Sequence, residues 1–302
     1  MIVGAQRSGT TWLQFLCAAH PKIAGSEELH LFSRYLGHVI GSYWTDLREY
    51  ANADRPQGLP CVLSQEEFDD ALRRFATTVF ARILHCKPGA TLAIEKTPDH
   101  VLHLHYIRHL FPNVKVIHVI RDPRDVVVSQ LAAAASWGEA WAPHGVADAA
   151  QRWVEWVGKG RQCAGSDLYT EVRYETLLSD GPRELARVYD FLGLPLEMEE
   201  VDRIYAQFSL AALKAAAAPS VLIKRPNATS PMADGDAGSA GIDHHAPREA
   251  FYRKGQAGAW RESLSEEDVR TVERIAGPLM DELGYAHEST DPASTPAVTA
   301  NH

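Results

Sequence analysis

A loop near the start of the chain carries residue types that bind anions. An apolar run at residues 2–5 leads into the loop, and a helical apolar pattern follows it from Trp12. A strand, a glycine-containing turn and a helix N-terminus together leave backbone N–H groups free at the positive end of the helix dipole, which is typical of a phosphate site. A guanidinium and three hydroxyls add donors. The predicted anion-binding residues are Arg7, Ser8, Gly9, Thr10 and Thr11.

The same loop lacks the G-x-x-x-x-G-K-[ST] pattern of ATP- and GTP-binding loops. The lysine and the metal-binding hydroxyl of those loops are missing, so we expect phosphate binding without a metal. The alternative interpretation is an ordinary strand–turn–helix corner.

Two distant segments carry further cations. Residues 115–120 are predicted to form a buried strand that ends at Arg121, in the crevice where open α/β sheets bind ligands. Ser129 lies in the helix predicted to follow that strand. Residues 253–260 combine two adjacent cations with two glycines, which gives a loop whose backbone can close around an anion. A surface salt bridge or a solvated basic turn accounts equally well for either segment taken alone.

Together the motifs QRSGTTW, IRDPRDVVVS and RKGxxGxW resemble those of the sulfotransferases that use 3′-phosphoadenosine 5′-phosphosulfate (PAPS). The resemblance spans residues 2–285 and implies a P-loop-like α/β domain. It implies that residues 7–12, which end at Trp12, hold the 5′-phosphosulfate end of PAPS. It also implies that Arg121, Ser129, Arg253, Lys254 and Gly255 hold the 3′-phosphate, and that Tyr174 and, less directly, Ser209 contact the adenine side.

A second group of residues matches the catalytic segments of heparan-type sulfotransferases. The segment E-x-H-x-F contains Glu28 and His30, and the segment E-K-T-P contains Lys96. The resemblance implies that Glu28 is a general base, and that Arg7 and Lys96 stabilise the charge on the leaving phosphate. Two departures stand out: Arg7 replaces the lysine usual in heparan-type and cytosolic relatives, and Pro98 stands where cytosolic relatives carry a histidine base. Whether Glu28 or a nearby histidine is the base stays open, since a solvated acidic turn and a core histidine are the alternatives.

A sheet is needed to bring these residues together. Strands predicted at residues 91–95, 115–120 and 169–174 alternate with helical patterns, which indicates βαβ units and a parallel sheet. We therefore expect one α/β domain at residues 1–286, P-loop-like by resemblance, with a central parallel sheet flanked by helices. Helices are predicted at residues 146–157, 182–192 and 266–283, a flexible loop or lid at residues 219–250, and a disordered tail at residues 287–302.

Composition narrows the range of partners. The chain has 302 residues and a formal net charge of −9, which argues against nucleic acid as its main partner. It contains no apolar run long enough to span a membrane and no signal-peptide pattern, and its four scattered cysteines favour reduced thiols in a cytoplasmic protein. We expect no metal site, because the spacing of His103, His105 and His109 places only two of these side chains on one helix face.

The function expected from the resemblance is transfer of a sulfuryl group from PAPS to a hydroxyl or amine, with adenosine 3′,5′-bisphosphate as the product. The expected acceptor is a hydrophobic or aromatic small molecule, because aromatic residues fall in the stretches that border the acceptor side by resemblance. Those residues are Tyr35, Tyr43, Trp44, Trp137 and Trp141. The alternatives are a nucleotide or small-molecule kinase on a related P-loop fold and a non-catalytic nucleotide-binding protein. The identity of the acceptor, O- against N-sulfation and the oligomeric state stay open.

Overall fold

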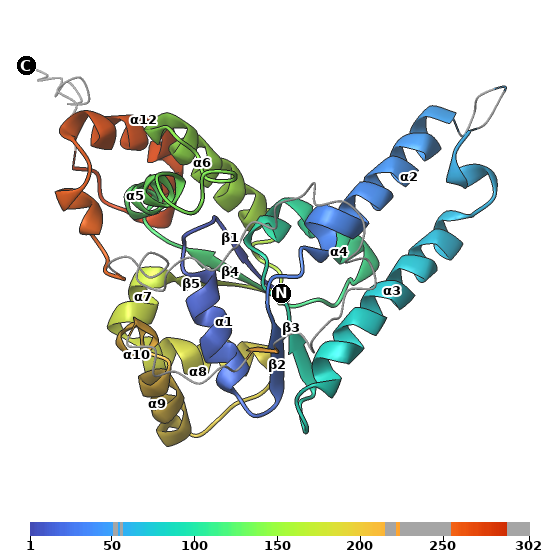
Figure 1. The fold of residues 1–302 in the computed structure, drawn as a ribbon, viewed down its shortest axis with the longest axis horizontal. Coiled ribbons are helices and arrows are strands. Elements are labelled where there is room, and N and C mark those ends of the chain that lie inside the picture. Colours follow the sequence, from blue (N-terminus) through green and yellow to red (C-terminus); the bar gives the residue numbers. More distant parts are fainter. Residues whose placement is uncertain (51–53, 55–56, 215–221, 224–254, 289–302) are drawn as a thin grey trace, which may run out of the picture.

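Parallel strands form the centre of the molecule (Figure 1). The computed structural model describes residues 1–50, 54, 57–214, 222–223 and 255–288. Hydrogen bonds join the strands in the order β1-β4-β5 in one sheet and β3-β2-β6 in another, and every one of these pairs is parallel. The strands are β1 (Ile2–Gly4), β2 (Ile23–Ser26), β3 (Leu92–Ile94), β4 (Val116–Ile120), β5 (Tyr169–Arg173) and β6 (Leu222–Ile223).

The two sheets meet along β1. The Ile2 N–H donates to the carbonyl of Glu95 over 2.9 Å, and Ile2 also pairs in parallel with Lys96. The strands that lead into the anion loop, the E-K-T-P segment and Arg121 therefore lie side by side. Because parallel strands end at the same edge of a sheet, these three segments come together at one edge. The predicted parallel sheet is confirmed.

Helices cover both faces of the sheets because the strands are apolar on both sides. On β4, Ile117 and Val119 pack into one hydrophobic cluster, whereas Val116 and Ile120 pack into the other. Figure 1 shows α1, α8 and α9 on one side of the strands and α5, α6 and α12 on the other. The helices are α1 (Thr10–Ala19), α2 (Gly37–Tyr50), α3 (Gln65–His85), α4 (Leu104–Leu110), α5 (Pro123–Ala134), α6 (Val146–Arg161), α7 (Tyr174–Ser179), α8 (Gly181–Leu192), α9 (Met198–Gln207), α10 (Leu210–Lys214) and α12 (Glu266–Leu283).

Local signals set the ends of the predicted helices. The Ser265 hydroxyl accepts the Asp268 N–H over 3.1 Å, which caps the start of α12. Gly193, with φ of 79°, ends α8 in the left-handed conformation that glycine adopts without strain. Helix α6 begins at the predicted residue but continues one turn further, to Arg161.

A pair of helices, α2 and α3, extends away from the sheets (Figure 1). The Tyr43 ring of α2 stacks on the Phe68 ring of α3 with centroids 4.0 Å apart. Tyr43 is fully buried by this contact, so it packs the arm together and does not face an acceptor. The π-helix Leu31–Leu36 connects the end of β2 to α2, and the 3-10 helix Pro98–His103 connects the end of β3 to α4.

The segment predicted as a loop contains one exception. Leu222 and Ile223 form β6, which pairs with β2 because two apolar residues can extend the open edge of that sheet. The rest of residues 219–250 lies outside the described residues. Of residues 287–302, His287 and Glu288 are described: the His287 Nε2 lies 2.9 Å from Asp281, and the Glu288 N–H donates to Glu273 over 2.9 Å. No helix among the described residues is both long and apolar enough to cross a bilayer.

Candidate functional site

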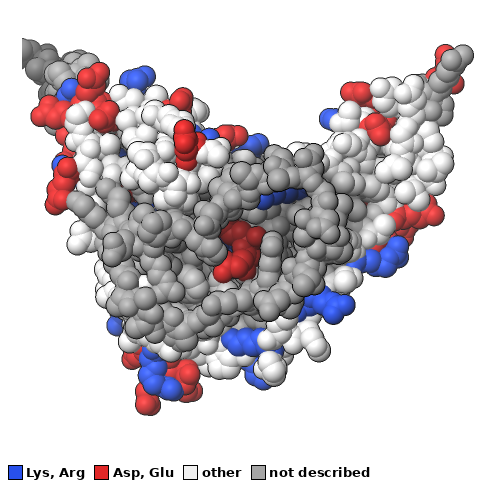
Figure 2. All heavy atoms as spheres, in the orientation of Figure 1, with Lys and Arg blue, Asp and Glu red and all other residues white. Residues whose placement is uncertain are grey.

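A cavity of about 580 Å³ opens where β1 and β4 end, at the point predicted from the strand order. Acidic and basic side chains meet near the centre of the face drawn in Figure 2. The cavity is lined by Gln6, Arg7, Gly9, Thr10, Thr11, Trp12, Glu27, Glu28, His30, Arg34, Lys96, Pro98, Asp99, Arg121, Ser129, Trp137, Trp141, Tyr174, Leu210, Gly255 and Ala259.

The loop after β1 turns through an unusual backbone. Arg7 has φ of 74° and Gly9 has φ of 97°, both in the left-handed region. For Arg7 this conformation is strained, and strain of this kind is kept where the fold needs a side chain or an amide in one direction. The Arg7 Nε donates to the Ser129 hydroxyl over 3.0 Å, and its guanidinium lies 5.3 Å from the centre of the Trp137 ring. The loop thus brings a cation from β1 against helix α5.

Gly9 has a second reason to be glycine. A Cβ at this position would lie 2.5 Å from the Tyr174 ring, so any side chain would displace that ring. Helix α1 begins at the next residue, Thr10, and the first N–H groups of a helix have no partner within the helix. The Ser8 N–H donates to the Ala5 carbonyl over 3.1 Å, so the backbone that faces the cavity for an anion is that of Gly9, Thr10 and Thr11 at the start of α1.

Arg121 closes the opposite side of the cavity. Its Nη1 donates to the carbonyl of Arg7 over 3.3 Å, and its Nη2 donates to the carbonyl of Gln256 over 3.0 Å. The guanidinium stacks 4.2 Å from the centre of the Tyr174 ring. The Arg121 Nε is buried and has no hydrogen-bond partner among the described residues, whereas the side chain as a whole lines the cavity. Burial raises the pKa of Tyr174, so this ring stays neutral beneath the cation.

An ion pair stands at the other end of the cavity. The Lys96 Nζ donates to the Glu28 carboxylate and, over 3.0 Å, to the Thr11 hydroxyl. Lys96 is buried, whereas the Glu28 side chain is 36% exposed. One cation thus bridges the anion loop and a carboxylate that faces the cavity. We call this set of Thr11, Glu28 and Lys96 the Lys96 end, and the set of Arg121, Tyr174 and Gly255 the Arg121 end.

His30 and Asp99 extend the Lys96 end. The His30 Nε2 lies 3.6 Å from Glu28, and its Nδ1 lies 3.8 Å from Asp99. Burial works against a charge on Asp99, but His30, His100 and Ser33 together outweigh it and hold the pKa of Asp99 below its ordinary value. Asp99 is not among the site residues predicted from the sequence, although it follows the E-K-T-P segment directly.

The glutamate of the E-K-T-P segment has a structural role. Glu95 is fully buried, where it accepts hydrogen bonds from the Thr97 hydroxyl and, over 2.9 Å, from the His100 ring. The same Thr97 hydroxyl accepts the His30 N–H over 3.2 Å. Glu95 therefore holds the backbone that carries His30, which has φ of 51°, without reaching the cavity.

Some predicted site residues lie away from the cavity. Ser8 is fully buried and its hydroxyl does not line the cavity. The Ser209 hydroxyl accepts the Ala212 N–H over 3.3 Å at the start of α10 and also does not line it. Arg253 and Lys254 lie outside the described residues. The roles of all four stay predictions.

The aromatic residues expected at the acceptor side divide between four places, one of which is the buried contact of Tyr43 with Phe68. Trp137 and Trp141 line the cavity with their ring centres 5.3 Å apart. Trp44 of α2 packs against Tyr106 of α4 with the ring centres 5.1 Å apart, and both residues line a separate surface hollow. Tyr35 is exposed. Arg34 and Glu27 line the cavity without having been predicted, since single charges in a sequence give no sign of where they point.

Two of the three histidines considered as metal ligands contact other side chains. The His109 Nε2 lies 2.7 Å from Asp69, and His105 packs against Tyr106. Among the residues the structure describes, no group of three His, Cys, Asp or Glu side chains is placed to hold a metal ion.

Comparisons with known proteins find sulfotransferases. The profile of the sulfotransferase family matches residues 1–198. A putative protein-tyrosine sulfotransferase of Caenorhabditis briggsae is 30% identical over 196 residues, which cover 63% of this chain and 64% of the relative. Human protein-tyrosine sulfotransferase 1 is 30% identical over 131 residues, which cover 43% of this chain and 33% of the relative. The chain thus spans less than two thirds of the length of these relatives.

A solved structure shares the fold. The mouse sulfotransferase SULT7A1 complexed with PAP superposes with a TM-score of 0.54 at 16% identity, over 94% of this chain and 84% of that one. The superposition extends beyond the residues matched by the family profile. Since that profile covers about two thirds of the chain, from the anion loop through β5 and α8, the protein belongs to the sulfotransferase family.

Proposed function

We propose that this protein transfers a sulfuryl group from PAPS to a hydroxyl or amine of a small-molecule acceptor, with Glu28 as the general base. The observation that carries the proposal is the convergence of Arg7, Arg121 and the Lys96–Glu28 pair on one cavity, from segments far apart in the sequence. The proposal rests on this geometry together with membership of the family.

The cavity fits a nucleotide that is anionic at two places. Backbone N–H groups at the start of α1, with Arg7 and Thr11, bind the 5′ end. Arg121 binds the 3′-phosphate together with Ser129 and the backbone at Gly255, since all three residues line the cavity. The mouse relative in complex with PAP, which is adenosine 3′,5′-bisphosphate, supports this assignment.

The Lys96 end provides the proton chemistry. PAPS supplies an activated sulfuryl group on a phosphate that leaves readily. Glu28 accepts the proton of the acceptor at the carboxylate oxygen that Lys96 leaves free, since Lys96 occupies Oε1. Lys96 and Arg7 stay cationic near the 5′ end and stabilise negative charge there, and His30 orients the second oxygen of Glu28 from 3.6 Å. A positioned base of this kind contributes about 10²–10⁴-fold to a rate.

The acceptor side is aromatic. Trp137 and Trp141 line the cavity beyond Arg7, and Leu210 adds apolar surface. Flat, apolar walls suit a hydrophobic or aromatic acceptor, and a phenol would place its hydroxyl near Glu28. A tyrosine side chain of a peptide presents the same phenol, and two relatives are named protein-tyrosine sulfotransferases. We propose a small molecule as the acceptor, and an acceptor panel that includes tyrosine peptides distinguishes the two.

Calorimetry tests the nucleotide, and mass spectrometry tests the acceptor. We expect tight binding of adenosine 3′,5′-bisphosphate without Mg²⁺ and weak binding of ATP. Incubation with PAPS and a panel of phenols, alcohols, amines and tyrosine peptides is expected to add one SO₃ group to an aromatic small molecule. Preference for ATP with Mg²⁺ would instead indicate a kinase. Tight nucleotide binding with no product from any acceptor would favour a non-catalytic nucleotide-binding protein.

A further inference from the structure

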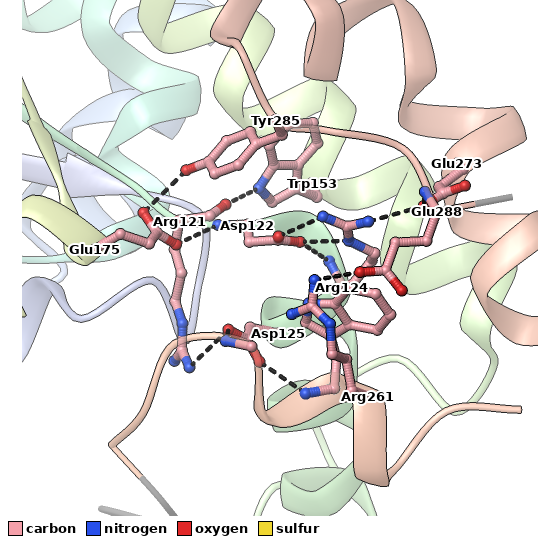
Figure 3. Close-up of polar contacts among 12 residues, drawn as sticks. Arg121, Asp122, Arg124, Asp125, Trp153, Glu175, Arg261, Glu273, Tyr285 and Glu288 are labelled. Carbon is pink, nitrogen blue, oxygen red and sulfur yellow. Dashed lines mark hydrogen bonds and ion pairs between the residues drawn. The ribbon is translucent and has the colours of Figure 1, made fainter.

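Two aspartates stand at the start of α5, and the structure gives them different partners. Acidic residues are common at a helix N-terminus because they complement the dipole, so both Asp122 and Asp125 have this ordinary explanation. The Asp122 carboxylate accepts the Arg124 N–H over 2.9 Å and pairs with the Arg124 guanidinium over 2.7 Å. Figure 3 shows Asp122 and Arg124 facing Glu273, whereas Asp125 faces Arg121. Asp125 therefore needs an explanation of its own.

Asp125 binds the backbone of a segment far away in the sequence. Its Oδ2 accepts the Gly258 N–H over 2.8 Å, and its Oδ1 accepts the Trp260 N–H over 3.0 Å. The side chain is completely buried, and the Arg121 Nη2 lies 3.6 Å from Oδ2. One carboxylate thus joins the start of α5, the strand end at Arg121 and residues 255–260, which we call the Gly-Trp segment.

The Gly-Trp segment in turn holds Arg121. The Arg121 Nη2, the same nitrogen that faces Asp125, donates to the carbonyl of Gln256 over 3.0 Å. Gly255 and Ala259 of the segment line the cavity, but Asp125 does not. Asp125 therefore cannot touch a ligand, and any effect it has on binding must pass through Arg121 and the segment.

The far end of the segment is fixed by its tryptophan. The Trp260 ring lies between two guanidinium groups, 4.1 Å from Arg124 and 4.4 Å from Arg261. It also packs with Val128 of α5 and Val269 of α12. These contacts hold the segment near α5, but none of them reaches Arg121. Asp125 is the carboxylate that contacts both Arg121 and the backbone of this segment.

We propose that Asp125 is a positioning residue for the 3′-phosphate: it fixes Arg121 and the Gly-Trp segment against each other so that the cavity distinguishes a nucleotide with a 3′-phosphate from one without. This inference rests on the proposed function. Two backbone N–H groups and the Arg121 guanidinium surround the Asp125 carboxylate and offset its negative charge, and the side chain does not line the cavity. An ionised carboxylate bonded in this way is a strong acceptor, and its amide isostere accepts at one oxygen only.

The test is the binding of two nucleotides by calorimetry. Adenosine 3′,5′-bisphosphate and adenosine 5′-phosphate differ only at the 3′ position, and the ratio of their dissociation constants measures recognition of that phosphate. In Asp125→Asn one buried backbone N–H loses its acceptor and Arg121 loses its counter-charge. We expect the ratio to fall by about tenfold, through weaker binding of the bisphosphate with little change for the monophosphate.

A matched variant separates positioning from general stability. Asp122→Asn makes the same chemical change three residues earlier, at a carboxylate that contacts Arg124 and neither Arg121 nor the Gly-Trp segment. We expect it to lower the melting temperature and leave the ratio unchanged. If Asp125→Asn keeps the wild-type ratio, or weakens both nucleotides equally, the inference is overturned. If the unmodified protein itself does not prefer the bisphosphate, the proposed function fails first and the inference fails with it.

Hydrogen exchange on the unmodified chain covers the case in which Asp125→Asn does not fold. The bisphosphate is expected to slow amide exchange across residues 255–260 more than the monophosphate does, because the Gly258 and Trp260 amides are held by the carboxylate that faces Arg121. Equal protection by the two nucleotides would contradict a coupling between the 3′-phosphate and this segment.

Discussion

The two ends of the cavity both pair a largely buried cation with an acid, but they differ in where the acid lies. At the Lys96 end the acid, Glu28, is 36% exposed and lines the cavity together with Lys96. At the Arg121 end the acid, Asp125, is completely buried and the cation alone lines the cavity. The acid is therefore open to a ligand at one end and closed off from it at the other.

This difference separates an acid that can react from an acid that can only position. A carboxylate that takes a proton from an acceptor needs a free oxygen and access to the cavity, and Glu28 has both. Asp125 uses both oxygens for backbone N–H groups, so it holds geometry and exchanges nothing with a ligand. Whether the acid of a pair faces the cavity thus predicts whether a variant at that end changes the rate or the affinity.

The largest effect is expected at the exposed acid. Glu28→Gln keeps the size of the side chain and one acceptor for Lys96 but removes the base. We expect kcat to fall about 10²–10⁴-fold with nucleotide affinity nearly unchanged. Steady-state rates with PAPS and an identified acceptor, together with calorimetry of adenosine 3′,5′-bisphosphate, measure the two quantities separately.

Glu27→Gln is the matched control for Glu28→Gln. Glu27 also lines the cavity, but the structure gives it no ion pair with Lys96. We expect this variant to keep most of the rate. Equal losses from Glu27→Gln and Glu28→Gln would mean that the cavity needs negative charge in general and not a base at one position.

The second effect is expected at Arg7. Arg7→Ala removes the guanidinium from the anion loop and its 3.0 Å hydrogen bond to Ser129. We expect kcat to fall about 10²–10³-fold, as for other preorganised donors that stabilise developing charge. Arg7→Lys keeps the charge and is expected to recover part of the loss in a steady-state assay. A variant Arg7→Ala that loses affinity but keeps kcat would place Arg7 with the Arg121 end.

The third effect is expected at Arg121, and it should be a loss of nucleotide affinity and not of rate. Arg121→Ala removes a charged donor at a phosphate, which costs about 10- to 100-fold in affinity. We expect this loss for adenosine 3′,5′-bisphosphate but not for adenosine 5′-phosphate, with kcat little changed at saturating PAPS. Calorimetry with both nucleotides and a rate at saturation check it. A fall in kcat at saturation would break the division between the two ends.

Much of this arrangement could be predicted from the sequence because local patterns determine it. The runs before the anion loop and Arg121 are short and apolar, so they read as buried parallel strands, and strand order then brings their ends together. Arg7, Lys96 and Glu28 were selected from motifs and do meet in one cavity. Gly9 carries its own signal, because only glycine combines a positive φ with so close a ring.

The rest depends on contacts that no local pattern reveals. Asp125 has the position of an ordinary helix-start acid, and its partners Gly258 and Trp260 lie more than 130 residues away. Ser8 has the residue type of a phosphate ligand but turns into the protein. Side-chain direction in a turn is decided by the packing around it, so residue type alone cannot distinguish a lining residue from a buried one.

The strands beneath the two ends also differ, and this difference gives a prediction about stability. β1, beneath Arg7, carries no titratable side chain, whereas β4, beneath Arg121, carries His118 at its centre. His118 is fully buried against α6, with its Nδ1 2.7 Å from the Tyr169 hydroxyl. Burial, with a smaller contribution from the charge of Arg161, lowers the pKa of His118 from 6.5 to about 3.

A lowered histidine pKa makes the folded state sensitive to acid. Below pH 6.5 the unfolded chain takes up a proton at His118 that the folded chain does not, so the stabilisation is complete above that pH and is lost as the pH falls toward 3. Between pH 7 and pH 5 this residue should lower the free energy of unfolding by about 2 kcal/mol. Urea denaturation at both pH values measures this fall in the free energy of unfolding.

His118→Gln is the control. It is expected to be less stable than the unmodified protein at pH 7, since it loses the contact with Tyr169. Its free energy of unfolding should fall less between pH 7 and pH 5, by the contribution of His118. An equal fall in the two proteins would mean that other histidines account for the acid sensitivity and that the strand beneath Arg121 is no more sensitive to pH than the strand beneath Arg7.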